Sequence, residues 1–95
     1  MERRKEPRLK ANQPVIVSSV GLMPMPPISG RTLDMSGSGL QLRLPNPIPC
    51  GSPVKVEAEH MVMMGEVTRC QYDVEGGYIV SLMVLESAPS SRTAS

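Results

Sequence analysis

Two short stretches hold most of the residues that could recognise a ligand. The first is R-R-K-E-P-R, residues 3–8, in which four of six residues are cationic. A guanidinium group offers paired N–H donors that fit a phosphate or the N7 and O6 edge of guanine, and it also stacks on flat rings. Pro7 disfavours helix at the preceding residue. Arg4 and Arg8 are therefore expected on an extended or turning arm that could hold one anionic guanine nucleotide from different sides.

The second stretch is D-M-S-G-S-G, residues 34–39. Asp, Ser and Gly favour turns, which predicts a strand-connecting turn here. The same residues suit a ligand: the Asp34 carboxylate can accept hydrogen bonds from the N1–H and N2–H edge of guanine, and the Ser36 hydroxyl adds a short polar contact. Gly39 leaves the approach free of a side chain. The two interpretations are compatible, because a turn can also be a binding site.

The charge of the chain is concentrated at its beginning. Residues 1–10 hold five Lys or Arg against two Glu, a net charge of +3, whereas residues 11–95 hold five basic and seven acidic groups, a net charge of −2. A broad basic surface for duplex nucleic acid is therefore not indicated. The distribution favours a small anion that is held by one segment.

Length and composition predict one small domain with an aliphatic core. The 95 residues include no Phe or Trp and two Tyr, so the core must be built from Val, Leu, Ile and the eight Met. Single-strand nucleic-acid binders use aromatic stacking platforms, which are scarce here. No apolar run approaches the roughly 20 residues of a membrane span. No apolar stretch follows the charged start as it would in a signal peptide, and these observations predict a cytoplasmic protein.

Metal and catalytic sites are not expected. Cys50, Cys70 and His60 are the only cysteines and the only histidine, too few for a tetrahedral zinc site. Without an export signal the two thiols are expected to be reduced, as ordinary buried or half-buried residues. No nucleophile–base pair stands out, and His60 is expected on the surface at the end of a strand. The chain is predicted to be no enzyme.

Alternation of apolar and polar residues predicts six strands separated by Pro- and Gly-rich turns. The clearest is G-L-Q-L-R-L, in which the three leucines point one way, and a bulge is expected at Gly65. Six short strands favour a closed antiparallel β-barrel, since closure removes exposed edges. The predicted strands cover residues 14–20, 28–35, 39–44, 54–60, 61–70 and 78–85. The predicted regions are a flexible arm at 1–13, a barrel at 14–86 and a disordered tail at 87–95.

The order R-x-x-x-R, first strand, second strand, D-x-S-x-x-G resembles the PilZ family, bacterial receptors for the second messenger cyclic di-GMP. The resemblance also rests on L-D-M-S-G-S-G-L-Q-L and, more weakly, on G-E-V and G-Y-I-V-S-L-M-V, and it covers roughly residues 3–85. It implies a six-stranded split barrel with an arm over one face. The residues that it implies for the ligand are Arg3, Arg4, Arg8, Asp34, Ser36 and Gly39. In the family, a cation at the position of Arg3 is associated with binding a stacked pair of ligands.

Two departures from the family pattern are visible. The family often closes its last strand with a glycine followed by an aromatic residue, where this chain reads S-L-M-V at 81–84. The helices that often follow the barrel are absent, because a Ser- and Ala-rich tail begins near Ala88. The first departure concerns packing more than binding. The second puts in doubt any partner contact that depends on a C-terminal helix.

The resemblance implies a stand-alone cytoplasmic receptor rather than an enzyme, with cyclic di-GMP as ligand and no cofactor. Ligand binding would order the arm over the barrel and signal to an unidentified downstream protein, without a membrane or nucleic acid as partner. Two alternatives stay open. The chain could be a nucleotide-independent adaptor with the same barrel, or a small-barrel nucleic-acid-binding protein, whose binding would depend steeply on salt.

Overall fold

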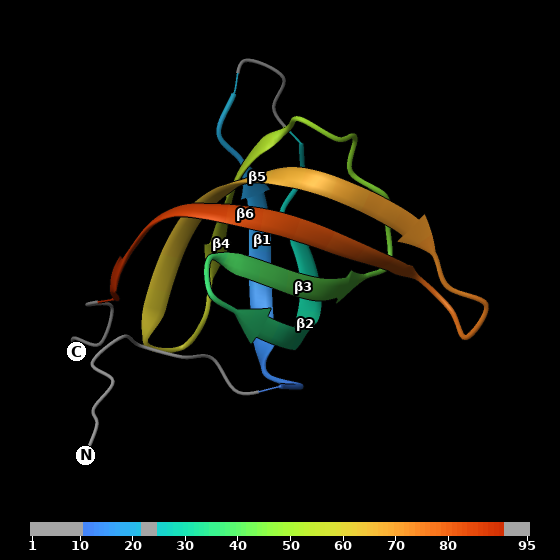
Figure 1. Cartoon of the computed structure of the whole chain (residues 1–95), viewed down its shortest axis with the longest axis horizontal. Coiled ribbons are helices and arrows are strands. Elements are labelled where there is room, and N and C mark those ends of the chain that lie inside the picture. The colour runs from blue at the N-terminus through green and yellow to red at the C-terminus, as the bar shows by residue number, and fades with distance from the viewer. Residues whose placement is uncertain (1–10, 22–24, 91–95) are drawn as a thin grey trace.

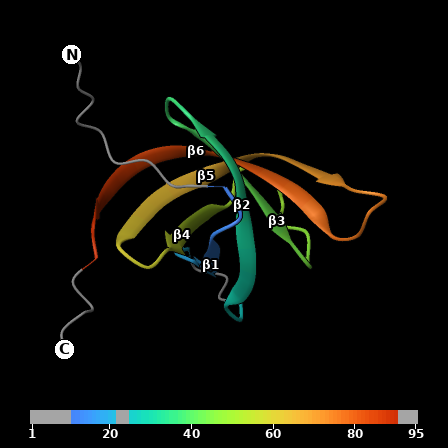
Figure 2. The ribbon, with the colours of Figure 1, turned by 90° about the horizontal axis from the view of Figure 1, so that it is seen from below.

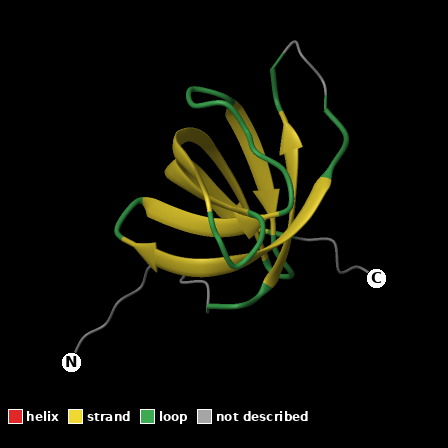
Figure 3. Cartoon of the chain, turned by 90° about the vertical axis from the view of Figure 1, so that its right-hand side faces the viewer, coloured by secondary structure: helices red, strands yellow, loops and turns green. Residues whose placement is uncertain are grey.

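The chain folds into a closed barrel of six antiparallel strands. The computed structural model describes residues 11–21 and 25–90, and these residues contain no helix (Figures 1 and 3). Around the barrel the strands follow the order β1-β2-β3-β6-β5-β4. Their bounds are β1 Pro14–Ser19, β2 Ile28–Ser36, β3 Gly39–Leu44, β4 Pro53–Glu57, β5 Met61–Tyr72 and β6 Tyr78–Pro89. The predicted all-β, six-stranded barrel is confirmed.

The strand boundaries differ from the predicted ones mainly at the end of the chain. β3 has the predicted bounds, and β4 stops at Glu57, three residues earlier than expected. β6 runs to Pro89, so residues 87–89 belong to a strand and not to the predicted tail. The reason is the length of its partner: Met61, at the start of β5, pairs with Pro89, and this ladder keeps the small residues of 87–89 in the sheet.

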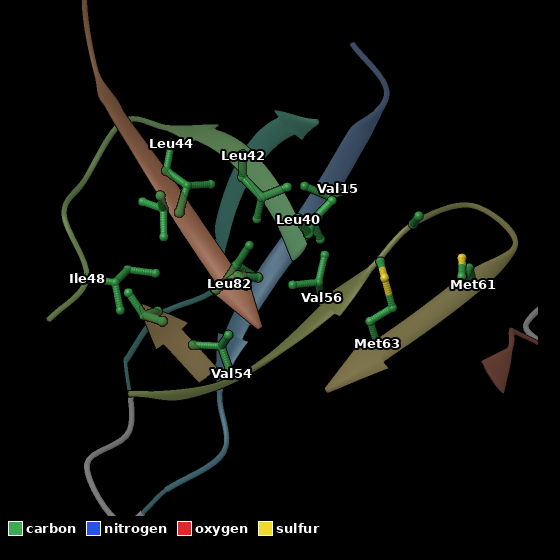
Figure 4. Packing of buried hydrophobic residues seen from close by; sticks show 14 residues of the cluster. Val15, Leu40, Leu42, Leu44, Ile48, Val54, Val56, Met61, Met63 and Leu82 are labelled. Atoms are coloured by element: carbon green, nitrogen blue, oxygen red, sulfur yellow. The ribbon is translucent and has the colours of Figure 1, made fainter. Parts of the chain in front are cut away.

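The core is aliphatic, as the composition required. It contains Val, Leu, Ile, Ala and Met side chains, and the three leucines of β3 all point into it beside Leu82 of β6 (Figure 4). Among the described residues, Thr32 is the one polar residue that is buried. Its hydroxyl accepts a hydrogen bond from Gln13 N–H at 2.9 Å, and its own N–H donates to Gln13 O at 2.9 Å. A buried polar group costs little once it is paired in this way.

Three irregularities interrupt the ladders. On β2 the register shifts between Thr32 and Asp34, so Leu33 is an extra residue opposite β3. The bulge predicted at Gly65 is confirmed by a shift between Met64 and Gly65, although the extra residue is Leu85 on β6. A further shift between Val67 and Arg69 leaves Thr68 unpaired in the ladder. Bulges bend and twist a strand, which helps a small sheet to close.

The two ends of the barrel are different in character. Because all neighbouring strands are antiparallel, β1, β3 and β5 begin, and β2, β4 and β6 end, at one end, which we call the motif end. At the opposite end the β5–β6 hairpin projects beyond the other strands (Figure 1). Arg43 fixes its tip: one guanidinium nitrogen lies 2.6 Å from the Asp73 carboxylate and donates to Gly76 O at 2.8 Å. Tyr72 and Tyr78 pack edge to face at its base.

The cysteines and the histidine agree only in part with expectation. Cys50 and Cys70 are not bonded to each other. Cys70 is half-buried as predicted, but Cys50 is exposed, because it lies in the loop before β4 and not in a strand. His60 lies on the surface, between β4 and β5, near Glu59. The part of the chain that the structure describes contains no helix long and apolar enough to cross a membrane.

Replacing Gly30 with alanine is expected to destabilise the barrel. A Cβ at this position would lie 2.5 Å from Arg43 O and closer still to Leu44 Cδ2, so β2 could not approach β3 as it does. Overpacking of this kind typically costs about 1–3 kcal/mol in the free energy of unfolding. Gly39→Ala is the matched control in the same pair of strands, since its Cβ would make only an ordinary contact at 3.4 Å. Urea denaturation of both variants checks the difference.

The hairpin tip is expected to loosen in acid. The hydrogen bond from Arg43, aided by one from Glu75 N–H, holds the pKa of the Asp73 carboxyl below its ordinary value. A lowered folded pKa stabilises the fold above the ordinary value, roughly 4. This contribution is lost as pH falls through the lower folded pKa. A carboxyl NMR titration should give a low pKa for Asp73 that rises toward the ordinary value in Arg43→Met, and an unchanged value in that variant would contradict the assignment.

Candidate functional site

The D-M-S-G-S-G stretch is more strand than turn. Asp34 and Ser36 lie in the last three residues of β2, and Gly39 is the first residue of β3, paired with Ser36. The expectation that this motif follows the second strand is therefore wrong. The connecting turn consists of Gly37 and Ser38 alone, and Gly37 has a φ of 58°. A positive φ at the first central residue is the pattern of a type II′ hairpin turn, which closes strands tightly enough for pairing to continue to Ser36.

The extra residue Leu33 decides which way the motif faces. Thr32 is buried and pairs with Leu42, while Asp34 is exposed and pairs with Gln41. The change from an inward to an outward side chain therefore takes two residues on β2 but only one on β3. In a regular strand Thr32 and Asp34 would share one face, because the side-chain period is two. The bulge therefore turns Asp34 and Ser36 outward while it keeps Thr32 in the core. Re-aiming a side chain beside a functional site is a recurring use of bulges.

Across the barrel wall the motif residues continue into two rows of outward residues. The registers of β2, β3, β6 and β5 place these rows side by side. The first row is Asp34, Gln41, Ser81 and Arg69. The second row is Ser36, Gly39, Met83 and Glu66. We call these eight residues the motif face. Gly39 is its one member without a side chain, so no side chain stands between the Ser36 hydroxyl and Met83, which is 42 % exposed.

The charge of the motif face is unbalanced. Asp34 and Glu66, with Glu86 of β6 nearby, form no ion pair with another residue of the described chain. The one cation of the face, Arg69, lies three strands from Asp34, about 14 Å at the usual strand spacing. A second cation, Arg31, is the outward residue of β2 before the bulge, and it is already hydrogen-bonded to Asn12. The Asp34 side of the face can therefore accept hydrogen bonds from a ligand, but it offers an anion little positive charge that is not already engaged.

The start of the barrel chain is fixed at the same end. Asn12 N–H donates to Thr32 O at 2.6 Å. The Arg31 guanidinium donates to the Asn12 side-chain oxygen at 2.7 Å and to Asn12 O at 3.1 Å. Residues 12 and 13, expected in the flexible arm, are thus hydrogen-bonded to β2 at residues two and three positions before Asp34. The polypeptide before Asn12 must leave from the motif end.

Sequence reasoning missed Asn12 and Arg31. Asn12 adopts a φ of 62°, and among the described residues it is the one non-glycine residue with a positive φ. Asn tolerates this conformation better than most residues, because its short side chain can hydrogen-bond locally. The position of Asn12 just before the first strand was the one sequence feature that could have indicated a turn residue there. Arg31 carried no signal beyond facing outward, since its partner lies 19 residues away in the sequence.

The structure brings three of the six predicted ligand residues together. Asp34, Ser36 and Gly39 lie on one exposed surface. The three arginines, Arg3, Arg4 and Arg8, lie outside the described residues, and only the point at which their segment joins the barrel is fixed. Among the described residues, no three His, Cys, Asp or Glu side chains gather in a way that could hold a metal ion.

Together these features define a small antiparallel barrel with a polar motif at the end where its chain begins. The sequence pattern of the PilZ domain family matches residues 2–93 of the chain. The chain therefore belongs to the PilZ domain family, whose domains bind cyclic di-GMP and act as receptors rather than as enzymes. No curated protein and no solved structure matches it.

The conformation of Asn12 predicts how its variants behave. Asn12→Ala loses the hydrogen bond from Arg31 and forces a side chain without local hydrogen bonding into a left-handed conformation, which costs about 1–2 kcal/mol of stability. Asn12→Gly loses the same hydrogen bond but adopts the conformation freely. Thermal or urea unfolding should therefore rank wild type above Asn12→Gly and Asn12→Gly above Asn12→Ala. Equal loss in both variants would show that the left-handed φ is not under strain.

Proposed function

We propose that this PilZ domain is a bacterial, cytoplasmic receptor that binds cyclic di-GMP between its N-terminal arginines and the motif face. The observation that carries the proposal is the Leu33 bulge, which turns Asp34 and Ser36 outward at the end from which residues 1–10 leave. The nucleotide is a ligand in this proposal and not a cofactor of a reaction. The membership in the PilZ family supports the same ligand.

Asp34 and Ser36 recognise one guanine base in this proposal. Asp34 is exposed and has no cationic partner in the described chain, so both carboxylate oxygens remain available as acceptors. The guanine edge offers N1–H and N2–H as adjacent donors, which a carboxylate matches. The Ser36 hydroxyl lies one outward position further along β2 and adds a contact. The missing side chain of Gly39 lets the base lie against the strand between Ser36 and Met83.

The phosphates need more positive charge than the described surface offers near Asp34, where Arg31 is already hydrogen-bonded to Asn12. Cyclic di-GMP carries two negative charges, and Glu66 and Glu86 add to the repulsion that it meets. The arm supplies Arg3, Arg4 and Arg8, whose guanidinium groups bind phosphate oxygens bidentately and stack on the bases. Ligand recognition is thereby divided: the barrel selects the guanine edge, and the arm supplies the charge that makes binding favourable.

The output of binding is a new surface. Residues 1–8 contain no apolar side chain after Met1, so the arm gains order from the ligand and not from a core of its own. Once it lies over the ligand, arm, nucleotide and barrel together present a surface that the free protein lacks. A downstream protein that recognises this composite surface would respond to the nucleotide without any chemical reaction.

Isothermal titration calorimetry of the full chain with cyclic di-GMP tests the proposal. Wild type is expected to bind with micromolar or tighter affinity, and the fitted stoichiometry distinguishes one nucleotide from a stacked pair. Arg8→Ala and Asp34→Ala should each weaken binding at least tenfold, because a hydrogen bond to a charged group contributes about 1.5–3 kcal/mol. Gly39→Ala should also weaken binding, through the added side chain, with no loss of stability.

Matched controls separate site effects from general charge effects. Glu75→Ala removes an exposed acid at the opposite end of the barrel, and Lys55→Ala removes a cation of β4. Both should bind like wild type. Absence of heat with a folded wild-type chain would reject the receptor function and favour the nucleotide-independent adaptor.

Salt dependence distinguishes the nucleotide from nucleic acid as ligand. A dinucleotide releases few counterions, so its affinity should fall gently between 50 and 200 mM salt, whereas binding to an oligonucleotide with many phosphate contacts falls steeply. The titrations should be repeated with a single-stranded oligonucleotide. Tighter binding to the oligonucleotide than to cyclic di-GMP would favour a nucleic-acid-binding function.

A further inference from the structure

A small hollow adjoins the motif face at the rim of the barrel. It has a volume of about 250 Å³ and is lined by Met35, the turn residues Gly37 and Ser38, and residues 84–87 of β6. Figure 2 shows this turn beside β6, and Val84 N–H donates to Ser38 O at 2.7 Å across its base. We call it the rim hollow. Its apolar wall consists of Met35, Val84 and Leu85, and the Leu85 side chain is 61 % exposed.

The hollow exists because two strands stop at different levels. β3 begins at Gly39 and pairs with β6 only up to Met83, while β6 continues to Pro89 beside β5. Beyond Met83 the edge of β6 therefore faces the β2–β3 turn and not another strand. Because Leu85 is the extra residue of the second bulge, its side chain is displaced from the regular alternation toward solvent. Apolar surface is left uncovered beside the proposed ligand site.

The segment outside the described residues is the right length to cover this surface. Asn12 is hydrogen-bonded at Thr32, and Met35 lies three residues further along β2, about 10 Å at the rise of a strand. Three residues of extended chain separate Leu9 from Asn12, which also spans about 10 Å. Leu9 is the first apolar residue after Met1. Its neighbours Arg8 and Lys10 are cationic, while Glu86 on the wall of the hollow has no cationic partner in the described chain.

We propose that Leu9 docks into the rim hollow and thereby positions Arg8 over the motif face. This inference rests on the proposed function for the role of Arg8, but the docking itself occurs with or without nucleotide. Leu9 buries its side chain against Met35, Val84 and Leu85, and Arg8 and Lys10 flank it near Glu86. Leu9 is a positioning residue: it touches no ligand, and it divides a fixed segment, 9–13, from the part that the ligand orders.

Methyl NMR of the full chain without nucleotide tests the docking. With ¹³C-methyl-labelled methionine, Leu9→Ser is expected to shift the Met35 methyl signal, which Met35→Leu identifies, while Leu9→Ile leaves that signal close to wild type. Met25 is the internal control, because it lies in the β1–β2 loop at the opposite end of the barrel. A Met35 signal that is identical in wild type and Leu9→Ser, with Met35 and Met25 both assigned, would overturn the proposal.

Calorimetry with cyclic di-GMP then tests the positioning. Leu9→Ser should weaken binding about tenfold, and Leu9→Ile less than threefold, while both variants remain folded at the temperature of the titration. A shifted Met35 signal in a chain that never binds nucleotide would reject the receptor function and leave the docking established. Unchanged affinity in Leu9→Ser, with wild-type binding intact, would show that Leu9 does not position Arg8.

Discussion

The extra residue in β2 is the constraint on which the rest of the arrangement depends. A sheet has only two faces, so a strand that must place Thr32 in the core and Asp34 in solvent cannot do so with regular alternation. Leu33 resolves this conflict by occupying a place that no residue of β3 faces. Everything beyond it, including the turn at Gly37 and the pairing of Ser36 with Gly39, follows in the shifted phase. The fold and the polar motif are compatible only through this one-residue offset.

In the proposed function, the division of charge between barrel and arm makes nucleotide binding depend on both parts of the chain. The described surface around Asp34 offers acceptors and the acids Glu66 and Glu86, while the cation on the same strand, Arg31, is already hydrogen-bonded to Asn12. Such a surface suits the donor edge of a base better than its phosphates. In the proposed function, a ligand that carries both a guanine edge and two phosphates is held only when the barrel and the arm act together. This requirement separates a dinucleotide from a single base, which would need no cations, and from simple phosphate, which would gain nothing from Asp34.

Sequence reasoning recovered the architecture and missed the connections between distant residues. Alternating leucines and valines predict strands directly, because a strand in a barrel has one buried face. Six such strands with short turns favour a closed barrel, because closure leaves no exposed sheet edge. The bulge at Gly65 was predicted because glycine weakens a regular ladder. The bulge at Leu33 was not, although the odd spacing between Ile28 and Leu33 is incompatible with one shared face. The contacts of Arg31 with Asn12 and of Arg43 with Asp73 join residues 19 and 30 positions apart, and no local pattern encodes such pairs.

The strand directions of the barrel also determine where anything attached to this domain would lie. β1 enters and β6 leaves at the motif end, and Ser90 N–H donates to His60 O there. A neighbouring domain joined by a short linker at either end would therefore stand beside the motif end. The opposite end, with the β5–β6 hairpin held by Arg43, is remote from both connections. In a larger assembly this hairpin would project on the side away from both linkers (Figure 1).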